Sequence, residues 1–335
     1  MPSALRRLPP MAWAYGALCL GLWPLPVLQV LHVESAALVA AMGFFGAGQA
    51  AIGALRRGEA GRRILQRELG LLLVPWGLLT ASLLWAPNRD YARGLALFAT
   101  FTGPSVALGV TLAYALARRG VQRVRTWHVG LGLTVALGSA LFDLGLHPQF
   151  YHYSHVWGGM LGPIYDEDLA VRPGLFAFRG VTLLWAALCV AVGRRHLRAT
   201  GLVLLALGGA YAFRGSLGFN TLPATLHRAL GPPLRTPHFD LYGEGLTPQE
   251  TEYRYAWLAA RLSTWPRQRV EVFIYPDVAT KRRLTGAGHT SVAPVWLATP
   301  QVHLVREAVE AHFGHELVHA FSREFGLPIL KASRH

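Results

Sequence analysis

Charged residues are scarce in this chain of 335 residues. Only 15% of the residues are Asp, Glu, Lys or Arg, whereas a soluble domain of this size carries about a quarter. Lysine is nearly absent, since Lys281 and Lys331 are the only two. Cysteine is equally rare: Cys19 and Cys189 both lie in apolar runs and form no CxxC motif. The sequence therefore gives no disulfide framework and no CxxC metal or redox site.

Long apolar runs take the place of the missing charge. Hydrophobic residues make up 52% of the chain, and its mean hydropathy is +0.31. A membrane-spanning helix needs roughly 20 mainly apolar residues. We therefore predict a polytopic α-helical membrane bundle over residues 1–220, with about seven spans at about 11–32, 36–55, 69–86, 94–117, 127–146, 174–193 and 200–218.

The arginines between these runs indicate how the chain is oriented. Clusters lie in every second loop, at 6–7, 56–67, 118–125 and 194–198, whereas the other loops hold only Arg89, Arg93 and Arg172. Short cytoplasmic loops collect Lys and Arg. We therefore predict a multi-pass protein with its N-terminus inside and its C-terminal domain outside. The preference for Arg, with abundant Ala, Leu and Gly, suggests a GC-rich bacterial genome, and hence a bacterial cytoplasmic membrane.

The net charge of +14 has the same topological explanation. In a soluble protein, such a charge would suggest a nucleic-acid partner. Here most arginines lie between apolar runs, so we predict the lipid bilayer as a partner and no nucleic acid.

Residues 1–36 have a second interpretation, as a cleaved signal peptide. The apolar core of such a peptide is normally about 7–15 residues long. The first run here is longer, contains Pro24 and Pro26, and is followed by further runs. We therefore favour an uncleaved first span.

The longest loop, at about 147–173, faces outward in this topology. Its aromatic residues suit the membrane–water interface, and His147, His152 and His155 are candidate metal ligands. Histidines two to five apart in a loop are weak evidence for a metal site, because no regular element is bound to bring them together. We favour a structured lid under the C-terminal domain, and a solvated loop is the alternative.

Three charged residues lie within or at the ends of spans: Asp143, Arg179 and Arg214. The simpler interpretation is that they lie at the membrane surface, with snorkelling or mutual pairing. The sharper hypothesis is that Asp143 pairs with one of the two arginines and fixes a site under the outer domain.

After a connector at 221–240, residues 241–335 predict a small α+β domain. Thr247 and Glu250 form a capping-box pattern that starts a helix at about 247–264. We predict its buried stripe to be Tyr253, Trp257, Leu258 and Leu262. The other predicted elements are a strand at 269–275, an edge strand at about 291–298, a short strand at 301–305 and a helix at about 306–324. Pro294 cannot donate a ladder hydrogen bond, which favours an edge position for the second strand.

The last helix carries an HExxH motif formed by His315, Glu316 and His319. Histidines four residues apart share one helical face, so both imidazoles can reach one ion. The glutamate lies about 100° round the helix, next to the ion and able to hold a water molecule. In such sites zinc polarises the water and the glutamate takes its proton. The alternative is an ordinary amphipathic helix, which can carry so short a motif by chance.

The motif and the order of elements over about 240–335 resemble the zincin metallopeptidases, and among them the minimal gluzincin-like domains. The resemblance implies that His315 and His319 ligate zinc and that Glu316 is the general base. It also implies that the edge strand around Ser291, Val292 and Ala293 binds an extended peptide by β-augmentation.

Gluzincins take a third zinc ligand from a glutamate on a following helix, and no such glutamate occurs before His335. The expected explanation is that the domain is incomplete at its C-terminus. The alternatives are that His335, His303, His289 or a histidine of the 147–173 loop supplies the ligand, that zinc binds weakly with water in the gap, or that the domain has lost its metal. His312, about one turn before His315, is expected to have a surface role.

Two functions follow as hypotheses. The first is a membrane-anchored zinc metallopeptidase that hydrolyses peptides or proteins outside the cytoplasmic membrane. The charged residues that flank the motif, among them Arg306 and Arg323, argue against a site inside the bilayer. The second is a non-catalytic membrane sensor or assembly protein whose degenerate zincin-like domain binds a partner.

Overall fold

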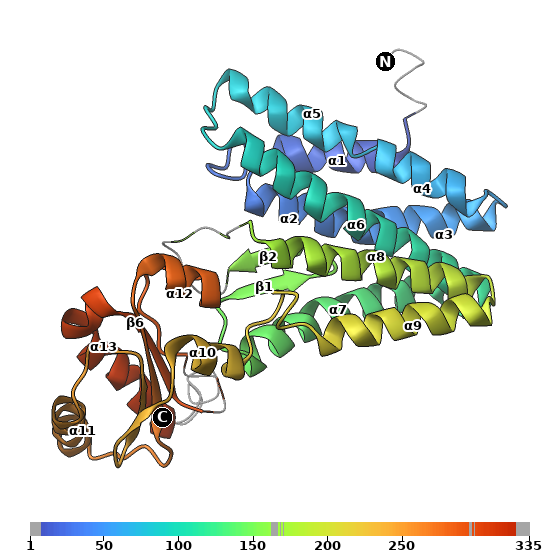
Figure 1. Cartoon of the computed structure of the whole chain (residues 1–335). Coiled ribbons are helices and arrows are strands. Elements are labelled where there is room, and N and C mark those ends of the chain that lie inside the picture. The colour runs from blue at the N-terminus through green and yellow to red at the C-terminus, as the bar shows by residue number, and fades with distance from the viewer. Residues whose placement is uncertain are drawn as a thin grey trace. The chain divides into compact units, whose positions relative to one another are not determined.

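The computed structural model describes residues 8–161, 167, 169, 171–294, 297 and 299–325 (Figure 1). The chain divides into two compact units. The first unit comprises Met1–Ala140, Tyr153–Met160 and Val171–Phe219. The second comprises Leu141–His152, Leu161–Ala170 and Asn220–His335. Each unit has its own core and is described by itself.

Helices make up most of the first unit. They are α1 (Pro10–Leu22), α2 (Val33–Met42), a π-helical turn (Gly43–Ala47), α3 (Gly48–Arg56), α4 (Gly61–Gly70), α5 (Leu73–Ala81), a 3-10 turn (Ser82–Leu84), α6 (Tyr91–Arg118), α7 (Val124–Leu146), α8 (Pro173–Gly193) and α9 (Leu197–Ala212). In the described part of the chain, five helical stretches are long and apolar enough to cross a membrane: Val33–Arg56, Gly61–Leu84, Tyr91–Arg118, Val124–Leu146 and Pro173–Gly193. These stretches confirm the prediction of a helical region like that of a membrane protein.

The predicted number of seven spans is wrong by this criterion of length. The first and last runs form the shorter helices α1 and α9, of 13 and 16 residues. At about 1.5 Å per residue they reach roughly 20 and 24 Å, less than the roughly 30 Å of a hydrocarbon core. The first run stops early because Pro24 and Pro26, which have no amide hydrogen, lie in the turns that follow α1.

Close packing in the first unit depends on glycine. A Cβ at Gly109 of α6 would lie 2.2 Å from the Phe44 carbonyl oxygen, and one at Gly94 would lie 2.0 Å from the Leu31 carbonyl oxygen. Such contacts are impossible for a larger residue. Small residues of this kind let helix backbones approach closely inside a membrane, where burial of apolar surface gives no driving force.

A buried arginine also ties this unit together. The guanidinium of Arg179 donates to the carbonyl oxygens of Thr100, Phe101 and Ser154 at 2.7–3.0 Å, and to Ser105 Oγ at 2.8 Å. The residue is 3% exposed. Arg179 is therefore an internal crosslink from α8 to the interior of α6 and to Ser154, in contrast to the surface position expected of it.

A four-stranded sheet forms the centre of the second unit. Its order is β3 (Leu234–Arg235), β4 (Phe239–Tyr242), β5 (Val270–Tyr275) and β6 (Gln301–Val305), with β4, β5 and β6 parallel and β3 antiparallel to β4. Four helices accompany it: α10 (Pro223–Leu230), α11 (Pro248–Leu262), α12 (Val278–Thr285) and α13 (Val309–Ser322). Parallel neighbours need crossover connections, and α11 and α12 lie in them.

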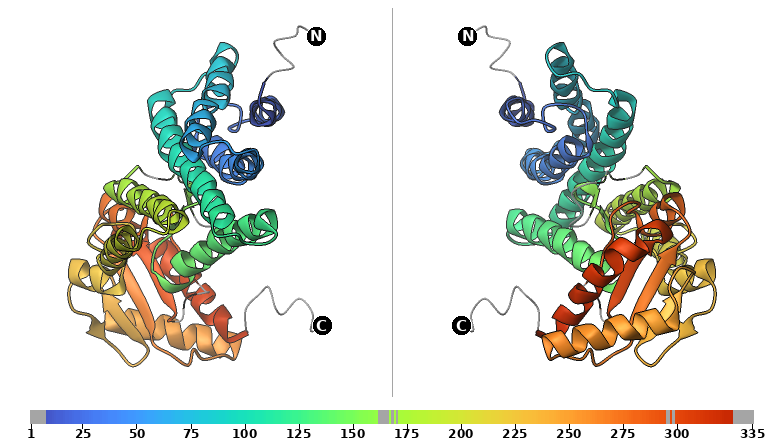
Figure 2. Two further views of the ribbon diagram at one scale, coloured as in Figure 1. Left: turned by 90° about the vertical axis from the view of Figure 1, so that its right-hand side faces the viewer. Right: turned by 90° about the vertical axis from the view of Figure 1, so that its left-hand side faces the viewer.

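Both faces of this sheet are covered. On one face Val272 and Ile274 pack with residues of α11 and α13, among them Tyr255 and Phe313. On the other face Phe273 packs in a separate cluster with residues that include Leu226 of α10 and Leu284 of α12. Figure 2 shows α13 lying against the strands. The double burial explains why β5 is apolar at almost every position, since central parallel strands lack a solvent face.

Most predicted elements of this unit are confirmed. The strand at 269–275 is β5, the strand at 301–305 is β6, and the last helix is α13 with a 3-10 turn at each end. The predicted edge strand is reduced to one antiparallel bridge between Val292 and His303, and residues 295, 296 and 298 lie outside the described part of the chain. Helix α12 was not predicted.

The buried stripe predicted for α11 is wrong in part. Thr247 caps the helix as expected, since its side chain accepts from the amide of Glu250 at 3.2 Å. Tyr253 and Trp257, however, are 70% and 51% exposed. The buried face runs instead through Thr251, Tyr255, Leu258 and Ala259. The predicted stripe and the observed stripe through Tyr255 have the same helical period. The position of the sheet therefore decides which of the two is buried.

Candidate functional site

Helix α13 presents the HExxH motif by burying its opposite side. Val309, Phe313 and Leu317, spaced four residues apart, are at most 5% exposed and belong to the core of the second unit. Residues with this spacing lie on one face. His315 and His319 therefore emerge on the exposed face.

The two histidines are close together. Nε2 of His315 lies 3.1 Å from Nε2 of His319, and the rings meet nearly edge to face. Two nitrogens that each lie 2.0–2.1 Å from a tetrahedral zinc ion are about 3.3 Å apart. The observed spacing thus fits two ligands of one zinc ion, with only a small adjustment of the side chains.

Glu316 differs from the two histidines of the motif by its burial. It is 6% exposed, and it interacts electrostatically with Lys281 of α12, which is fully buried. Desolvation lowers the pKa of Lys281 to about 8, although the negative charges of Glu167 and Glu316 oppose that shift. Glu316 thus lies in surroundings from which water is largely excluded, whereas His315 and His319 are exposed.

The predicted edge residues lie next to β6. The amide of Val292 donates to the His303 carbonyl at 3.2 Å, and the His303 amide donates back at 2.8 Å. Ser291 Oγ lies 2.8 Å from Nδ1 of His312, about one turn before His315 on α13. Ser291, Val292 and Ala293 are therefore held between the sheet and the helix that carries the motif.

Both ring nitrogens of His303, one of the candidate third ligands, are occupied by hydrogen bonds. Its Nε2 lies 3.1 Å from Gln301 Oε1, and its Nδ1 lies 2.9 Å from the Tyr275 hydroxyl. The amide nitrogen of Gln301 donates to Glu271, so its amide oxygen is the end that faces His303. An amide oxygen can only accept. Nε2 therefore carries the proton and Tyr275 donates to Nδ1. Desolvation, assisted by the charge of Lys281, holds the pKa of His303 well below its ordinary value.

Among the described residues, no other candidate ligand forms a metal-binding group with the two histidines. His289 is exposed, and His335 lies outside the described residues. His147, His152 and His155 each contact a partner of their own, at the Phe142 carbonyl, Asp143 and Thr182. In the part of the chain that the structure describes, no group of three or more His, Cys, Asp or Glu residues could hold a metal ion. The described residues thus bring two histidines together, whereas catalytic zinc normally has three protein ligands.

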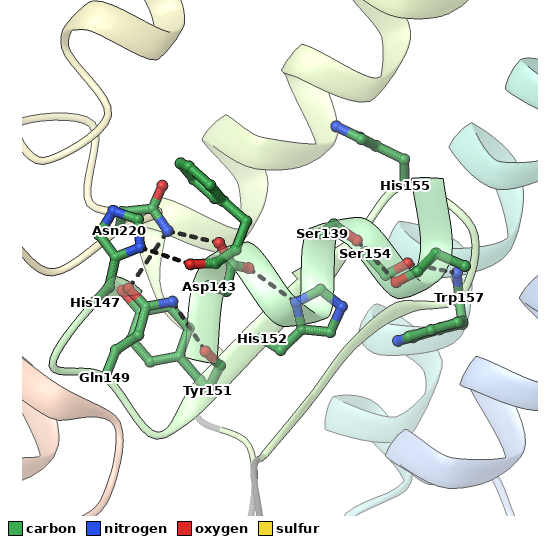
Figure 3. A network of polar contacts seen from close by, with 12 residues as sticks. Ser139, Asp143, His147, Gln149, Tyr151, His152, Ser154, His155, Trp157 and Asn220 are labelled. Atoms are coloured by element: carbon green, nitrogen blue, oxygen red, sulfur yellow. Dashed lines mark hydrogen bonds and ion pairs between the residues drawn. The ribbon is translucent and has the colours of Figure 1, made fainter. Parts of the chain in front are cut away.

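A second polar cluster, around Asp143, was not foreseen in this form. Figure 3 shows the Asp143 carboxylate between His152 Nδ1, at 2.9 Å, and Asn220 Nδ2, at 2.8 Å. Gln149 accepts from the Thr221 amide at 2.7 Å. The contacts of Asp143 with His152 and Asn220 join the end of α7 to the start of the C-terminal segment, whereas the hypothesis had paired Asp143 with an arginine. No sequence signal points to them, because the partners lie as many as 77 residues apart.

Comparison with known proteins leaves the site to be judged on its own geometry. No family model matches the chain, and neither a curated protein nor a solved structure does.

Proposed function

We propose that the chain is a membrane-anchored zinc metallopeptidase that hydrolyses peptide bonds on the outer side of a bacterial cytoplasmic membrane. The observation that carries the proposal is the pair of imidazoles with Nε2 atoms 3.1 Å apart, together with the burial of Glu316, the residue that follows His315. His315 and His319 would hold the metal, with a third ligand from outside the described residues. Zinc there would supply Lewis-acid activation of a water molecule and of the scissile carbonyl.

Glu316 acts as the general base in this proposal. Its carboxylate would accept a proton from the attacking water and deliver it to the departing amine, the usual double role of an acid–base residue.

The edge segment Ser291–Ala293 would bind the substrate. Val292 uses both of its main-chain groups toward His303. Along an extended strand, such groups alternate between the two sides. The main-chain groups of Ser291 and Ala293 therefore face away from β6, where an extended peptide can add as a further strand.

The proposed location rests on the arginine clusters between the spans. Short cytoplasmic loops collect Lys and Arg, which favours the cytoplasmic side for residues 56–67, 118–125 and 194–198. An outer position of the C-terminal unit then requires α9 to cross as well, although its 16 residues reach only about 24 Å. Local thinning of the bilayer around a short helix is an inexpensive adjustment.

The alternative function is a non-catalytic sensor or assembly protein whose zincin-like unit binds a partner. The observation in its favour is that the described residues supply only two of the three usual ligands.

Substitution of Glu316 distinguishes the two. We would measure chelator-sensitive hydrolysis of fluorescein-labelled β-casein by the detergent-purified chain, and by its Glu316→Gln and Glu310→Gln variants. Glu310 is an exposed glutamate of the same helix and serves as the control. The proposal predicts a loss of at least about 100-fold in Glu316→Gln alone, the usual contribution of a general base. Hydrolysis at the wild-type rate by Glu316→Gln would rule out the mechanism, and casein binding without hydrolysis would favour the alternative.

A further inference from the structure

Thr290, the residue just before the edge segment, is held by two buried side chains of opposite charge. Glu167 Oε1 accepts from the Thr290 amide at 2.9 Å and from its hydroxyl at 3.0 Å. Glu167 Oε2 accepts from the Gly288 amide at 2.6 Å. On the other side, Lys281 Nζ donates to the Thr290 carbonyl. We call Glu167, Thr290 and Lys281 the clamp.

The charges of the clamp are almost completely removed from water. The Glu167 side chain is 1% exposed, and Lys281 is fully buried. Burial alone would raise the pKa of Glu167, but the hydrogen bonds from Thr290 and Gly288 lower it below its ordinary value. A buried carboxylate that keeps its charge in this way is bound firmly to its donors. The clamp therefore holds the main chain at Thr290 by its amide and its carbonyl, and the side chain by its hydroxyl.

Its position gives the clamp control over the edge segment. Ser291 and Val292 follow Thr290 directly, and Val292 pairs with His303. A slip of one residue in such a pairing would turn every side chain to the opposite face and exchange the inward and outward main-chain groups. By fixing Thr290, the clamp fixes the register in which the edge faces a peptide.

Glu167 comes from a distant part of the chain, the connection of residues 147–172 between the helices α7 and α8. Other residues of this connection contact the same region. The Phe150 amide donates to the Thr285 carbonyl at 2.8 Å, next to the end of α12. The ring of Tyr151 lies so close to Gly286 that a Cβ there would come within 2.7 Å of it. Two segments of the connection thus belong structurally to the C-terminal unit.

We propose that Glu167 and Lys281 are positioning residues that hold Ser291–Ala293 in register for an extended peptide substrate, so that the connection between two membrane-spanning helices forms part of the substrate-binding edge. The inference rests on the proposed peptidase function. It gives the membrane region a role beyond anchoring, since one of its outer connections contributes to substrate affinity.

The test uses the full chain in detergent, with Glu167→Gln and Thr290→Val as variants. Thr290→Val removes only the hydroxyl bond and keeps the shape of the side chain, so it serves if Glu167→Gln fails to fold. Glu252→Gln is the control, because Glu252 also accepts a backbone amide and a side-chain bond in this unit, from His238. Three readouts are compared: KM and kcat for fluorescein-labelled β-casein, the rate of tryptic cleavage after Arg282 and Arg283, and zinc content.

The clamp predicts that Glu167→Gln raises KM about tenfold while kcat stays within about twofold, since a charge-assisted hydrogen bond is lost without change to the reacting groups. Tryptic cleavage should accelerate, and zinc content should not change. Thr290→Val should move KM and cleavage in the same direction by a smaller factor, and Glu252→Gln should move neither. Unchanged cleavage, or faster cleavage with unchanged KM, would overturn the inference. If the wild type does not hydrolyse casein, the peptidase proposal fails, and the Kd for labelled casein replaces KM in the same comparison.

Discussion

Ser291 and His312 join the edge segment to the helix of the HExxH motif, with Oγ and Nδ1 2.8 Å apart. His312 was expected to have a surface role, and it is exposed. Its contact with Ser291 ties the edge segment to α13.

Replacement of His312 should therefore affect substrate binding more than chemistry. In His312→Ala the Ser291 hydroxyl loses its partner and the edge becomes less firmly held, so we expect KM to rise about threefold to tenfold, the effect of one neutral hydrogen bond. Zinc content should stay at the wild-type value. A loss of zinc in His312→Ala would show instead that His312 is a ligand.

The buried face of α13 predicts a contrast between two substitutions on the same helix. Phe313 is fully buried, with its ring 6.2 Å from that of Phe239, whereas Val318 is 39% exposed. Phe313→Ala should lower the free energy of unfolding by about 3–5 kcal/mol, and Val318→Ala should change it by less than about 0.5 kcal/mol. Thermal unfolding in detergent measures both. Equal effects would mean that α13 buries a different face.

Lys281 predicts a pH dependence of stability. Its pKa in the folded chain is about 8, below its ordinary value of 10.5. Between these pH values the unfolded chain binds a proton that the folded chain has lost, so the free energy of unfolding must rise with pH across this window. The rise amounts to about 3 kcal/mol at most.

Lys281→Met removes this contribution while it keeps much of the volume of the side chain. We expect the difference in Tm, wild type minus Lys281→Met, to become more positive as the pH is raised from 7.5 to 9.5. The charged or titratable groups that interact with Lys281 are Glu167, Glu316 and His303, and none of them has an ordinary pKa in that range. If the Tm values of the two proteins change with pH in parallel, the lowered pKa of Lys281 is contradicted.

The orientation of the chain can be tested with single cysteines. In a background in which Cys19 and Cys189 are changed to serine, Gln122→Cys reports on a predicted cytoplasmic turn and His289→Cys on the C-terminal unit. Both positions are exposed. A membrane-impermeant maleimide applied to intact spheroplasts should label His289→Cys and should reach Gln122→Cys only after lysis. The reverse pattern would place the C-terminal unit in the cytoplasm.

The features that sequence predicted well are those set by neighbouring residues. The cap of α11 at Thr247 is a contact over three residues, and β5 is recognisable from six consecutive residues. The pairing of His315 with His319 depends only on the period of one helix. Each of these needs no knowledge of the rest of the fold.

Other features depended on partners elsewhere in the chain. Glu167 contacts Thr290 across 123 residues, and no periodicity or spacing links the two. Tyr253 and Trp257 fit a buried stripe by period alone, and the sheet decided against them. Helix α12 did leave local signals, since Asp277 accepts from the Thr280 amide and Gly286 closes the helix in the left-handed conformation. They were hidden by the polar, arginine-rich residues between them.

The central claim, that α13 carries a zinc site, is tested most directly by the zinc content of the detergent-purified chain beside that of His319→Ala. His227→Gln is the control, because His227 belongs to the same unit and stacks on Tyr242, with ring centroids 4.5 Å apart, instead of facing the motif. We predict close to one zinc per chain in the wild type and in His227→Gln, and its loss in His319→Ala. Absence of zinc from the wild type after supplementation, or equal zinc in His319→Ala, would contradict the assignment of a zinc site to α13.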